Sequence, residues 1–137
     1  MRQRVFLDTN VLIYADDADA GDKRVRAQRT LRDAIVSGTG VISTQVLQEF
    51  FVVATRKLGV DVADARRKVE LLSSLDVVRI RSDDILAAID LHRLHSFSFW
   101  DALILRCALV AGCMRLLTED LQDGQVIEGL TIHNPFG

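Results

Sequence analysis

The 137-residue sequence contains two cysteines, one proline and no long apolar run. Cys107 and Cys113 lie six residues apart in an apolar stretch, which argues against a disulfide framework and favours two core thiols. Every apolar run falls well short of the roughly 20 residues that a membrane span requires. Too few apolar residues precede Asp8 to form the hydrophobic part of a secretory signal, so we expect a cytoplasmic protein.

The sequence also lacks a strong net charge of either sign. Its 17 Lys and Arg residues against 19 Asp and Glu residues give −2, so no overall basic field indicates nucleic acid. The positive charges nevertheless gather on two predicted helices, as Lys23, Arg24, Arg26, Arg29 and Arg32, and as Arg66, Arg67 and Lys68. A charged run is most often the solvated face of a helix, but four residues of the first group are also available for phosphate contacts: Lys23, Arg24, Arg26 and Arg29.

Short apolar strands alternate with helical patterns along the whole chain. The expected strands cover residues 5–7, 41–42, 77–80, 115–118 and 130–133. The expected helices cover residues 11–15, 22–36, 44–58, 62–75, 83–94 and 99–111. This alternation predicts an α/β fold, a three-layer α/β/α domain over residues 1–137 with a mostly parallel sheet of four to five strands.

Four carboxylates occupy positions that a surface charge would not need. Asp8 and Asp120 each follow an apolar strand, and Glu49 borders the apolar face of its helix. Asp101 is the only acid near the start of a helix that is apolar nearly all round. Each acid also has a simpler role open to it, as a helix cap, the partner of a buried arginine or a turn residue.

The predicted topology lets these acids converge. If strands 5–7 and 115–118 are parallel, Asp8 and Asp120 lie at the same edge of the sheet, and the helix with Asp101 leads into the second strand. Carboxylates a few ångströms apart cannot all stay ionised unless a cation neutralises them. Oxygen ligands without cysteine or histidine favour a hard cation, Mg²⁺ or Mn²⁺.

Other chemistries find little support in the sequence. His92, His95 and His133 lie beside no metal-like or nucleophile-like pattern, so we expect them to be structural or exposed to solvent. No glycine-rich loop that could hold a phosphate is present.

Four segments together point to a known family. They are Leu-Asp-Thr-Asn-Val-Leu at 7–12, Glu49, Phe-Trp-Asp-Ala-Leu-Ile at 99–104 and Leu-Thr-Glu-Asp at 117–120. In their order and spacing the chain resembles PIN domains and, more narrowly, the VapC toxins of bacterial toxin–antitoxin pairs. The resemblance spans nearly the whole chain, and its most specific part is the distance from Trp-Asp-Ala-Leu-Ile to Thr-Glu-Asp.

The resemblance implies a set of site residues and partners. The implied catalytic residues are Asp8, Glu49, Asp101 and Asp120, with Asp8, Asp101 and Asp120 as ligands of Mg²⁺ or Mn²⁺ and Asn10 and Thr118 as polar supports. The implied function is that of a metal-dependent endoribonuclease, the toxin of a type II toxin–antitoxin system, acting as a homodimer on RNA and blocked by a cognate antitoxin.

Three nearby residues lie outside this implied core set. Ser43 matches a position where the family favours a small hydroxyl. Asp123 is not part of the core pattern in every member, and Glu119 is expected to face solvent.

Other functions remain open at this point. A phosphatase of the haloacid dehalogenase type needs a second acid two residues after its nucleophile, where this chain has Asn10. A receiver domain needs its acid after a middle strand and a late lysine. A PIN-like interaction module without catalysis would use the acids only to bind a structural ion or an arginine-rich peptide, although the presence of all four acids argues against it.

Overall fold

The structure, a computed structural model, describes residues 3–137. The strands are β1 (Val5–Leu7), β2 (Gly40–Ser43), β3 (Asp76–Val78), β4 (Arg115–Leu117), β5 (Val126–Ile127) and β6 (Leu130–His133). The helices are α1 (Thr9–Asp16), α2 (Asp22–Ser37), α3 (Thr44–Arg56), α4 (Val62–Leu72), α5 (Ser82–His95) and α6 (Phe99–Val110). Every helix and strand expected from the sequence is present in this part of the chain.

Within residues 3–137 the strands form one six-stranded sheet in the order β3-β2-β1-β4-β6-β5. All neighbouring pairs are parallel except β5 and β6, which confirms the mostly parallel α/β fold. The expected count of four to five strands was too low because β5 has only two residues, too few to show a strand pattern. Glu128 and Gly129 form the tight turn to β6, both with positive φ.

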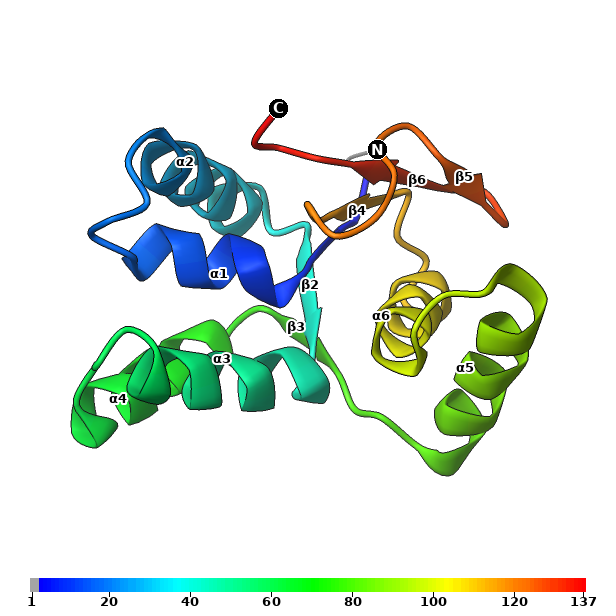
Figure 1. The fold of residues 1–137 in the computed structure, drawn as a ribbon, viewed down its shortest axis with the longest axis horizontal. Coiled ribbons are helices and arrows are strands. Elements are labelled where there is room, and N and C mark those ends of the chain that lie inside the picture. The colour runs from blue at the N-terminus through cyan, green and yellow to red at the C-terminus, as the bar shows by residue number, and fades with distance from the viewer. Residues whose placement is uncertain (1–2) are drawn as a thin grey trace.

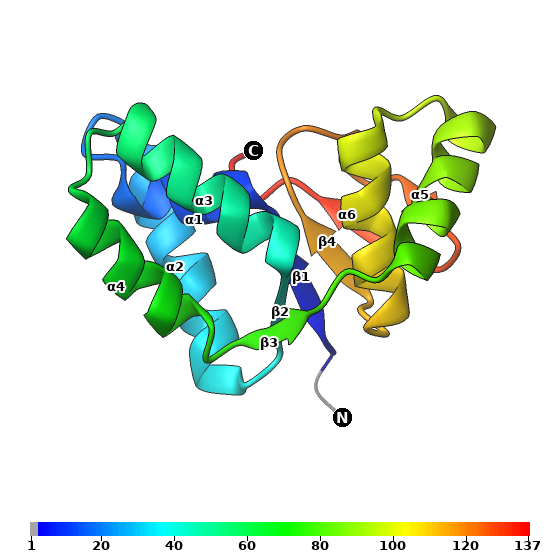
Figure 2. The ribbon, with the colours of Figure 1, turned by 90° about the horizontal axis from the view of Figure 1, so that it is seen from below.

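Helices flank the sheet on both sides (Figures 1 and 2). Helices α1 to α4 gather on one side of β1, β2 and β3, where α1 packs on α2 and α3, and α3 packs on α4. Helix α5 packs on α6 on the other side, and α6 contacts β2 and β4. None of the helices in residues 3–137 combines the length and apolar character needed to cross a bilayer.

The core confirms the buried strands. Phe6, Leu7, Ile42 and Leu116 are completely buried, as continuous apolar runs predict for strands covered on both faces. Burying each such side chain contributes about 1.5–3 kcal/mol. Both cysteines are buried and unpaired, as expected.

Helix α2 buries only part of the apolar face that its sequence suggests. Of the four apolar residues expected on its core face, Ala34 is buried and Leu31 packs against the core, whereas Val25 and Ile35 are about half exposed at 51% and 52%. Ala27, which is also buried, was not expected there. Small side chains are needed here because α2 approaches β2 closely. A Cβ on Gly40 would come within 2.9 Å of the Ala34 Cβ.

Three helices begin at the carboxyl edge of the sheet with side-chain caps. Asp8 caps α1, Ser43 caps α3 and Ser98 caps α6 by accepting hydrogen bonds from backbone N–H groups of the first turn. Their positive dipole ends therefore meet at the edge where the strands end, which favours negative charge there. The structure therefore confirms the simpler role considered for Asp8, that of a helix cap.

Candidate active site

Asp8 lies at the carboxyl edge of the two central strands. Strands β1 and β4 are parallel with Leu7 opposite Leu117, so the next residues along, Asp8 and Thr118, lie side by side. The Asp8 N–H donates to the Leu117 carbonyl at 3.0 Å, and the Thr118 hydroxyl donates to Asp8 Oδ2 at 2.8 Å. The parallel pairing predicted for these strands is confirmed.

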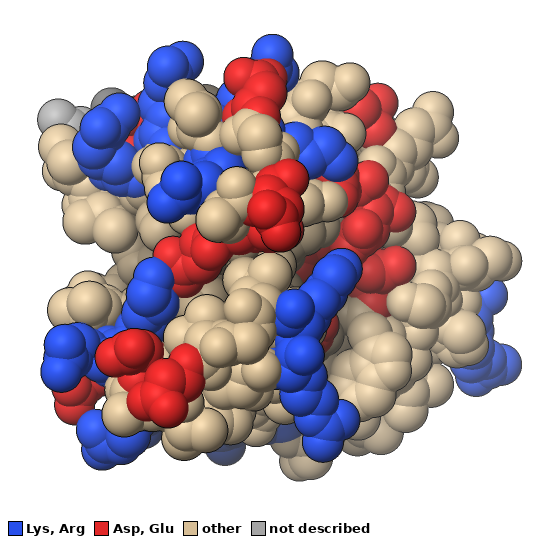
Figure 3. Space-filling model, turned by 60° about the vertical axis from the view of Figure 1, so that its left-hand side comes forward, with Lys and Arg blue, Asp and Glu red and all other residues tan. Residues whose placement is uncertain are grey.

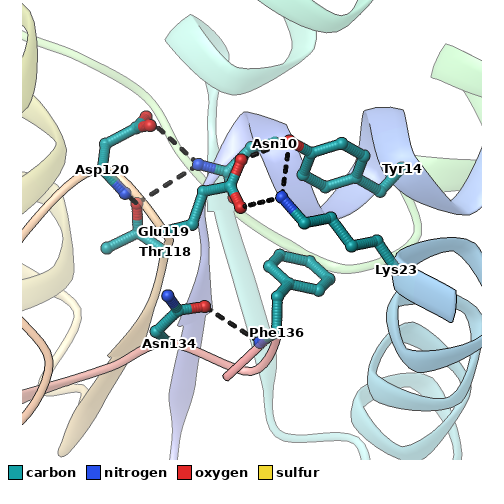
Figure 4. Close-up of polar contacts among 8 residues, drawn as sticks. All are labelled: Asn10, Tyr14, Lys23, Thr118, Glu119, Asp120, Asn134 and Phe136. Carbon is teal, nitrogen blue, oxygen red and sulfur yellow. Dashed lines mark hydrogen bonds and ion pairs between the residues drawn. The ribbon is translucent and has the colours of Figure 1, made fainter. Parts of the chain in front are cut away.

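Thr118 is the centre of a small polar network (Figure 4). Its completely buried hydroxyl accepts hydrogen bonds from the Asp120 N–H at 3.1 Å and from Asn10 Nδ2 at 3.3 Å. Asn10 Nδ2 also donates to Asp120 Oδ2 at 3.1 Å. The two residues expected as polar supports thus connect Asp8 to Asp120.

Glu49 approaches from α3 and Asp101 from the first turn of α6. Gln45 Nε2 donates to Glu49 Oε1 at 2.7 Å and to the Trp100 carbonyl at 3.3 Å, and so joins the two helices beside both acids. The backbone N–H of Asp101 donates to the hydroxyl of Ser98, the residue that caps α6.

Gln45 is a residue of this region that the sequence interpretation missed. It is only 4% exposed, and its spacing of four residues from Glu49 on one helix was the available signal.

The acids interact electrostatically. Burial raises the pKa of Asp8 to about 7, and the negative charges of Asp120 and Glu49 add to the rise, against hydrogen bonds from Thr118 and Thr9. Burial also raises the pKa of Glu49 and of Asp101, with contributions from Asp120 to both. All four acids therefore share one field. Among the described residues, no Lys or Arg contributes to these three shifts.

The donor chemistry of this cluster fits a hard cation. Asp8 is 6% exposed and its bonding partners are neutral groups, and the side-chain oxygens of Thr9 and Asn10 are buried without a hydrogen-bond partner. Carboxylate and amide oxygens are the ligands that Mg²⁺ and Mn²⁺ take. Within residues 3–137, however, no three Asp, Glu, His or Cys side chains stand in an arrangement ready to hold an ion. The acids are neighbours without forming a preassembled coordination shell.

Glu119 does not face solvent as expected. Its side chain is only 22% exposed, and it accepts hydrogen bonds from the Tyr14 hydroxyl and from Lys23 Nζ, the latter at 2.9 Å. Burial alone would raise the pKa of Glu119, but these two hydrogen bonds outweigh it and lower the pKa. The expectation was wrong because the turn after β4 directs this side chain towards α1 and α2, as Figure 4 shows.

The remaining predicted residues lie outside the acidic cluster. Asp123 accepts a hydrogen bond from the Asn134 N–H at 2.9 Å and lies 3.6 Å from the His133 ring, in the C-terminal part of the fold. Ser43 is completely buried as the cap of α3. His92, His95 and His133 are exposed, as expected.

Comparison with known proteins gives one family and several structures. The model of the PIN domain family matches residues 5–122. No curated protein matches the chain.

The solved structures show the same fold at low identity. A chain of a toxin–antitoxin complex from Klebsiella pneumoniae has a TM-score of 0.72 and 23% identity, with 96% of this chain and 98% of that chain covered. VapC20 of Mycobacterium tuberculosis, named a sarcin–ricin loop cleaving toxin, has a TM-score of 0.67 and 21% identity, with 82% and 86% covered. VapBC2 of Rickettsia felis, bound to a DNA fragment from its promoter, has a TM-score of 0.67 and 20% identity, with 95% and 97% covered.

Proposed function

This chain belongs to the PIN domain family, and from that premise we propose that it is a metal-dependent endoribonuclease, which hydrolyses RNA phosphodiester bonds. One observation carries the proposal. Asp8, Glu49, Asp101 and Asp120 come from separate elements. Burial raises the pKa values of Asp8, Glu49 and Asp101, and the negative charge of Asp120 adds to all three rises, with no Lys or Arg of residues 3–137 among the causes. Groups with perturbed pKa values concentrate at functional sites.

Asp8, Asp101 and Asp120 would hold Mg²⁺ or Mn²⁺, and Glu49 completes the catalytic set. When bound, such an ion offsets the charge that develops on a phosphodiester during hydrolysis and activates water for attack. The chain's own part is orientation. Thr118 and the Thr9 N–H fix one oxygen each of Asp8, and Gln45 fixes Glu49. Asn10 donates a hydrogen bond to Asp120 and so keeps its carboxylate near Asp8.

Basic side chains near α2 support an RNA substrate. Figure 3 shows acidic side chains across the middle of one face, with Lys and Arg side chains above and below them. On α2, Lys23 pairs with Glu119, and Arg26 pairs with Asp22 at 2.8 Å. Arg24 and Arg29 are exposed and have no ion pair among residues 3–137, so they are the phosphate contacts we propose. Such contacts weaken as the salt concentration rises.

We further propose that residues 1–137 form one nuclease domain, the toxin of a type II toxin–antitoxin pair in the cytoplasm. The Klebsiella and Rickettsia complexes, which pair a toxin with an antitoxin, support a cognate antitoxin as partner. The name of VapC20 as a cleaving toxin supports the nuclease activity. Apolar side chains that α5 leaves exposed, Leu86 at 61% and Leu94 at 76%, support a homodimer.

The test is RNA cleavage by the purified protein, freed of any partner. We expect cleavage of total RNA with Mg²⁺ or Mn²⁺, none with a chelator, and recovery when the ion is restored. Metal-dependent binding without any RNA product would favour the interaction module instead. A phosphorylated Asp8, trapped after incubation with a phosphate ester, would favour the phosphatase.

A further inference from the structure

Three side chains from distant parts of the sequence meet behind the turn that carries Asp120. Glu119 Oε1 accepts a hydrogen bond from the Tyr14 hydroxyl, and Glu119 Oε2 accepts one from Lys23 Nζ at 2.9 Å. Lys23 Nζ lies 3.5 Å from the Tyr14 hydroxyl oxygen, which closes the triangle seen in Figure 4. We call Tyr14, Lys23 and Glu119 the Glu119 clamp.

Helix α1 holds this turn at two points, one helical turn apart. Asn10 and Tyr14 are four residues apart and therefore lie on the same side of the helix. Asn10 binds Thr118 and Asp120, and Tyr14 binds Glu119 between them. Since the same helix is capped by Asp8, the two contacts fix where Asp120 lies relative to Asp8.

The C-terminal segment covers one side of the clamp. The Phe136 ring meets the Tyr14 ring edge-on, with centroids 5.0 Å apart, and Lys23 Nζ lies 4.9 Å from the Tyr14 centroid. Phe136 is itself placed by its N–H, which donates to Asn134 Oδ1 at 2.9 Å. The Lys23 side chain remains 45% exposed, so water competes for the ion pair, and the ring contacts add to its placement.

The contacts leave Lys23 little freedom to serve RNA. Its ammonium is shared between a carboxylate and a phenol and lies over an aromatic ring. Of the basic residues that open α2, it is the one tied to the loop of the proposed site. A lysine whose role was to bind an RNA phosphate would not need these intramolecular partners.

We propose that Tyr14 and Lys23 are positioning residues that act through Glu119 to hold Asp120 in its place beside Asp8. The inference rests on the proposed function, because it assigns these residues a role in the same site. They touch neither the metal ligands nor the substrate in this role. Their effect is on how well Asp120 is placed when the ion and RNA bind.

The experiment compares Tyr14→Phe, Glu119→Gln and Lys23→Met with the wild type and with Lys57→Met. Lys57 is an exposed lysine at the end of α3 that has no role in the proposed site, so its variant is the matched control. Mn²⁺ affinity is followed without RNA through the fluorescence of Trp100, the single tryptophan, which is adjacent in sequence to Asp101. Turnover of an RNA substrate gives kcat and KM separately.

We expect each clamp variant to weaken Mn²⁺ binding and to lower kcat by about 3- to 10-fold, the range for one lost hydrogen bond, with KM unchanged. Lys23→Arg should restore much of the loss, and Lys57→Met should match the wild type. Unchanged kcat and Mn²⁺ affinity in all clamp variants would overturn the inference, as would a change confined to KM, which would make Lys23 an RNA contact. A wild-type protein that neither binds Mn²⁺ nor cleaves RNA would overturn the proposed function first.

Discussion

Two aspartates of this chain are equally buried and electrostatically opposite. Asp8 is 6% exposed and Asp84, near the start of α5, is 5% exposed. Asp84 accepts a hydrogen bond from Arg106 Nε at 3.1 Å and another from the Arg81 N–H at 2.9 Å. Burial raises the pKa of Asp84, but these partners outweigh it and lower the pKa. The pKa of Asp8 rises to about 7.

The difference teaches what the chain does with a buried charge. Asp84 has a cationic partner, Arg106, and this ion pair stabilises the packing of α5 on α6. Asp8 instead has neutral hydrogen-bond donors and other acids around it. Its negative charge can therefore be neutralised only by a proton or by a bound cation. Burying a charge without a partner costs free energy that a purely structural acid would avoid. This contrast supports the proposed role of Asp8 beyond the fold.

The largest expected effect comes from removing the charge of Asp8. Asp8→Asn should lower RNA cleavage by roughly 10³-fold, since the ion it helps to hold supplies several kcal/mol of charge stabilisation. The metal-free variant should be at least as stable as the wild type, because a repulsive charge is gone. Cleavage rates and urea unfolding measure the two effects. Asp19→Asn, at an exposed acid, is the control, and undiminished cleavage by Asp8→Asn would refute the role of Asp8.

Stability should also depend on pH in opposite directions for the two aspartates. Because the folded pKa of Asp8 is about 7, above its usual 3.8, its proton stabilises the metal-free fold at low pH, and this contribution is lost as pH rises to 7. Relative to Asp8→Asn, the wild type should lose up to about 4 kcal/mol over that interval.

The lowered pKa of Asp84 has the opposite consequence. Its contribution is present above the usual pKa of 3.8 and is lost as pH falls through the lower folded value, so the deficit of Asp84→Asn should grow as pH rises through that range and stay constant above it. Urea unfolding with a chelator measures both trends, at about pH 3 and 5 for Asp84 and at about pH 5, 6 and 8 for Asp8. Parallel trends for the two variants would erase the contrast between the aspartates.

The next largest effect is expected when the ion pair between Asp84 and Arg106 is broken. Arg106→Met leaves Asp84 buried without its cation and should lower the free energy of unfolding by about 3 kcal/mol. Arg93→Met, at an exposed position of α5, should stay within about 0.5 kcal/mol of the wild type. Both variants should still cleave RNA when folded, as neither residue contributes to the pKa shifts of Asp8, Glu49 or Asp101. A stable Arg106→Met protein would show that Asp84 does not need its partner.

The contrast also shows what the sequence could predict. Local patterns placed the buried strands and the acids at their ends, because burial on both faces leaves a continuous apolar run and a parallel sheet aligns its carboxyl ends. The two-residue strand β5 left no such pattern. On helix α2 the pattern correctly placed Ala34 on the buried face but missed Ala27, because a small residue carries little hydrophobic signal.

Contacts between residues far apart in the chain could not be predicted from the sequence. Glu119 meets Tyr14 across 105 residues and Lys23 across 96, and nothing in the local pattern distinguishes it from an exposed turn acid. The same holds for Asp84 and Arg106, which lie 22 residues apart on two helices. The sequence can therefore mark acids placed for chemistry, but only the folded chain shows which of them have a cation.

The smallest effect tests whether neutral support, rather than a cation, is what the site acids require. Gln45 lowers the pKa of Glu49 by hydrogen bonding and also binds the Trp100 carbonyl, so Gln45→Met removes both contacts at nearly unchanged side-chain length. We expect cleavage to fall by about 10-fold, the usual cost of losing a hydrogen bond to a charged group, and the acidic limb of the pH–rate profile to move to higher pH. Gln48→Met, at the exposed glutamine one position before Glu49, should leave both unchanged. If Gln45→Met also leaves the cleavage rate and the pH–rate profile unchanged, Glu49 needs no orienting partner. The hydrogen bonds that neutral groups make to Asp8 and Glu49 would then not explain how these acids work in cleavage.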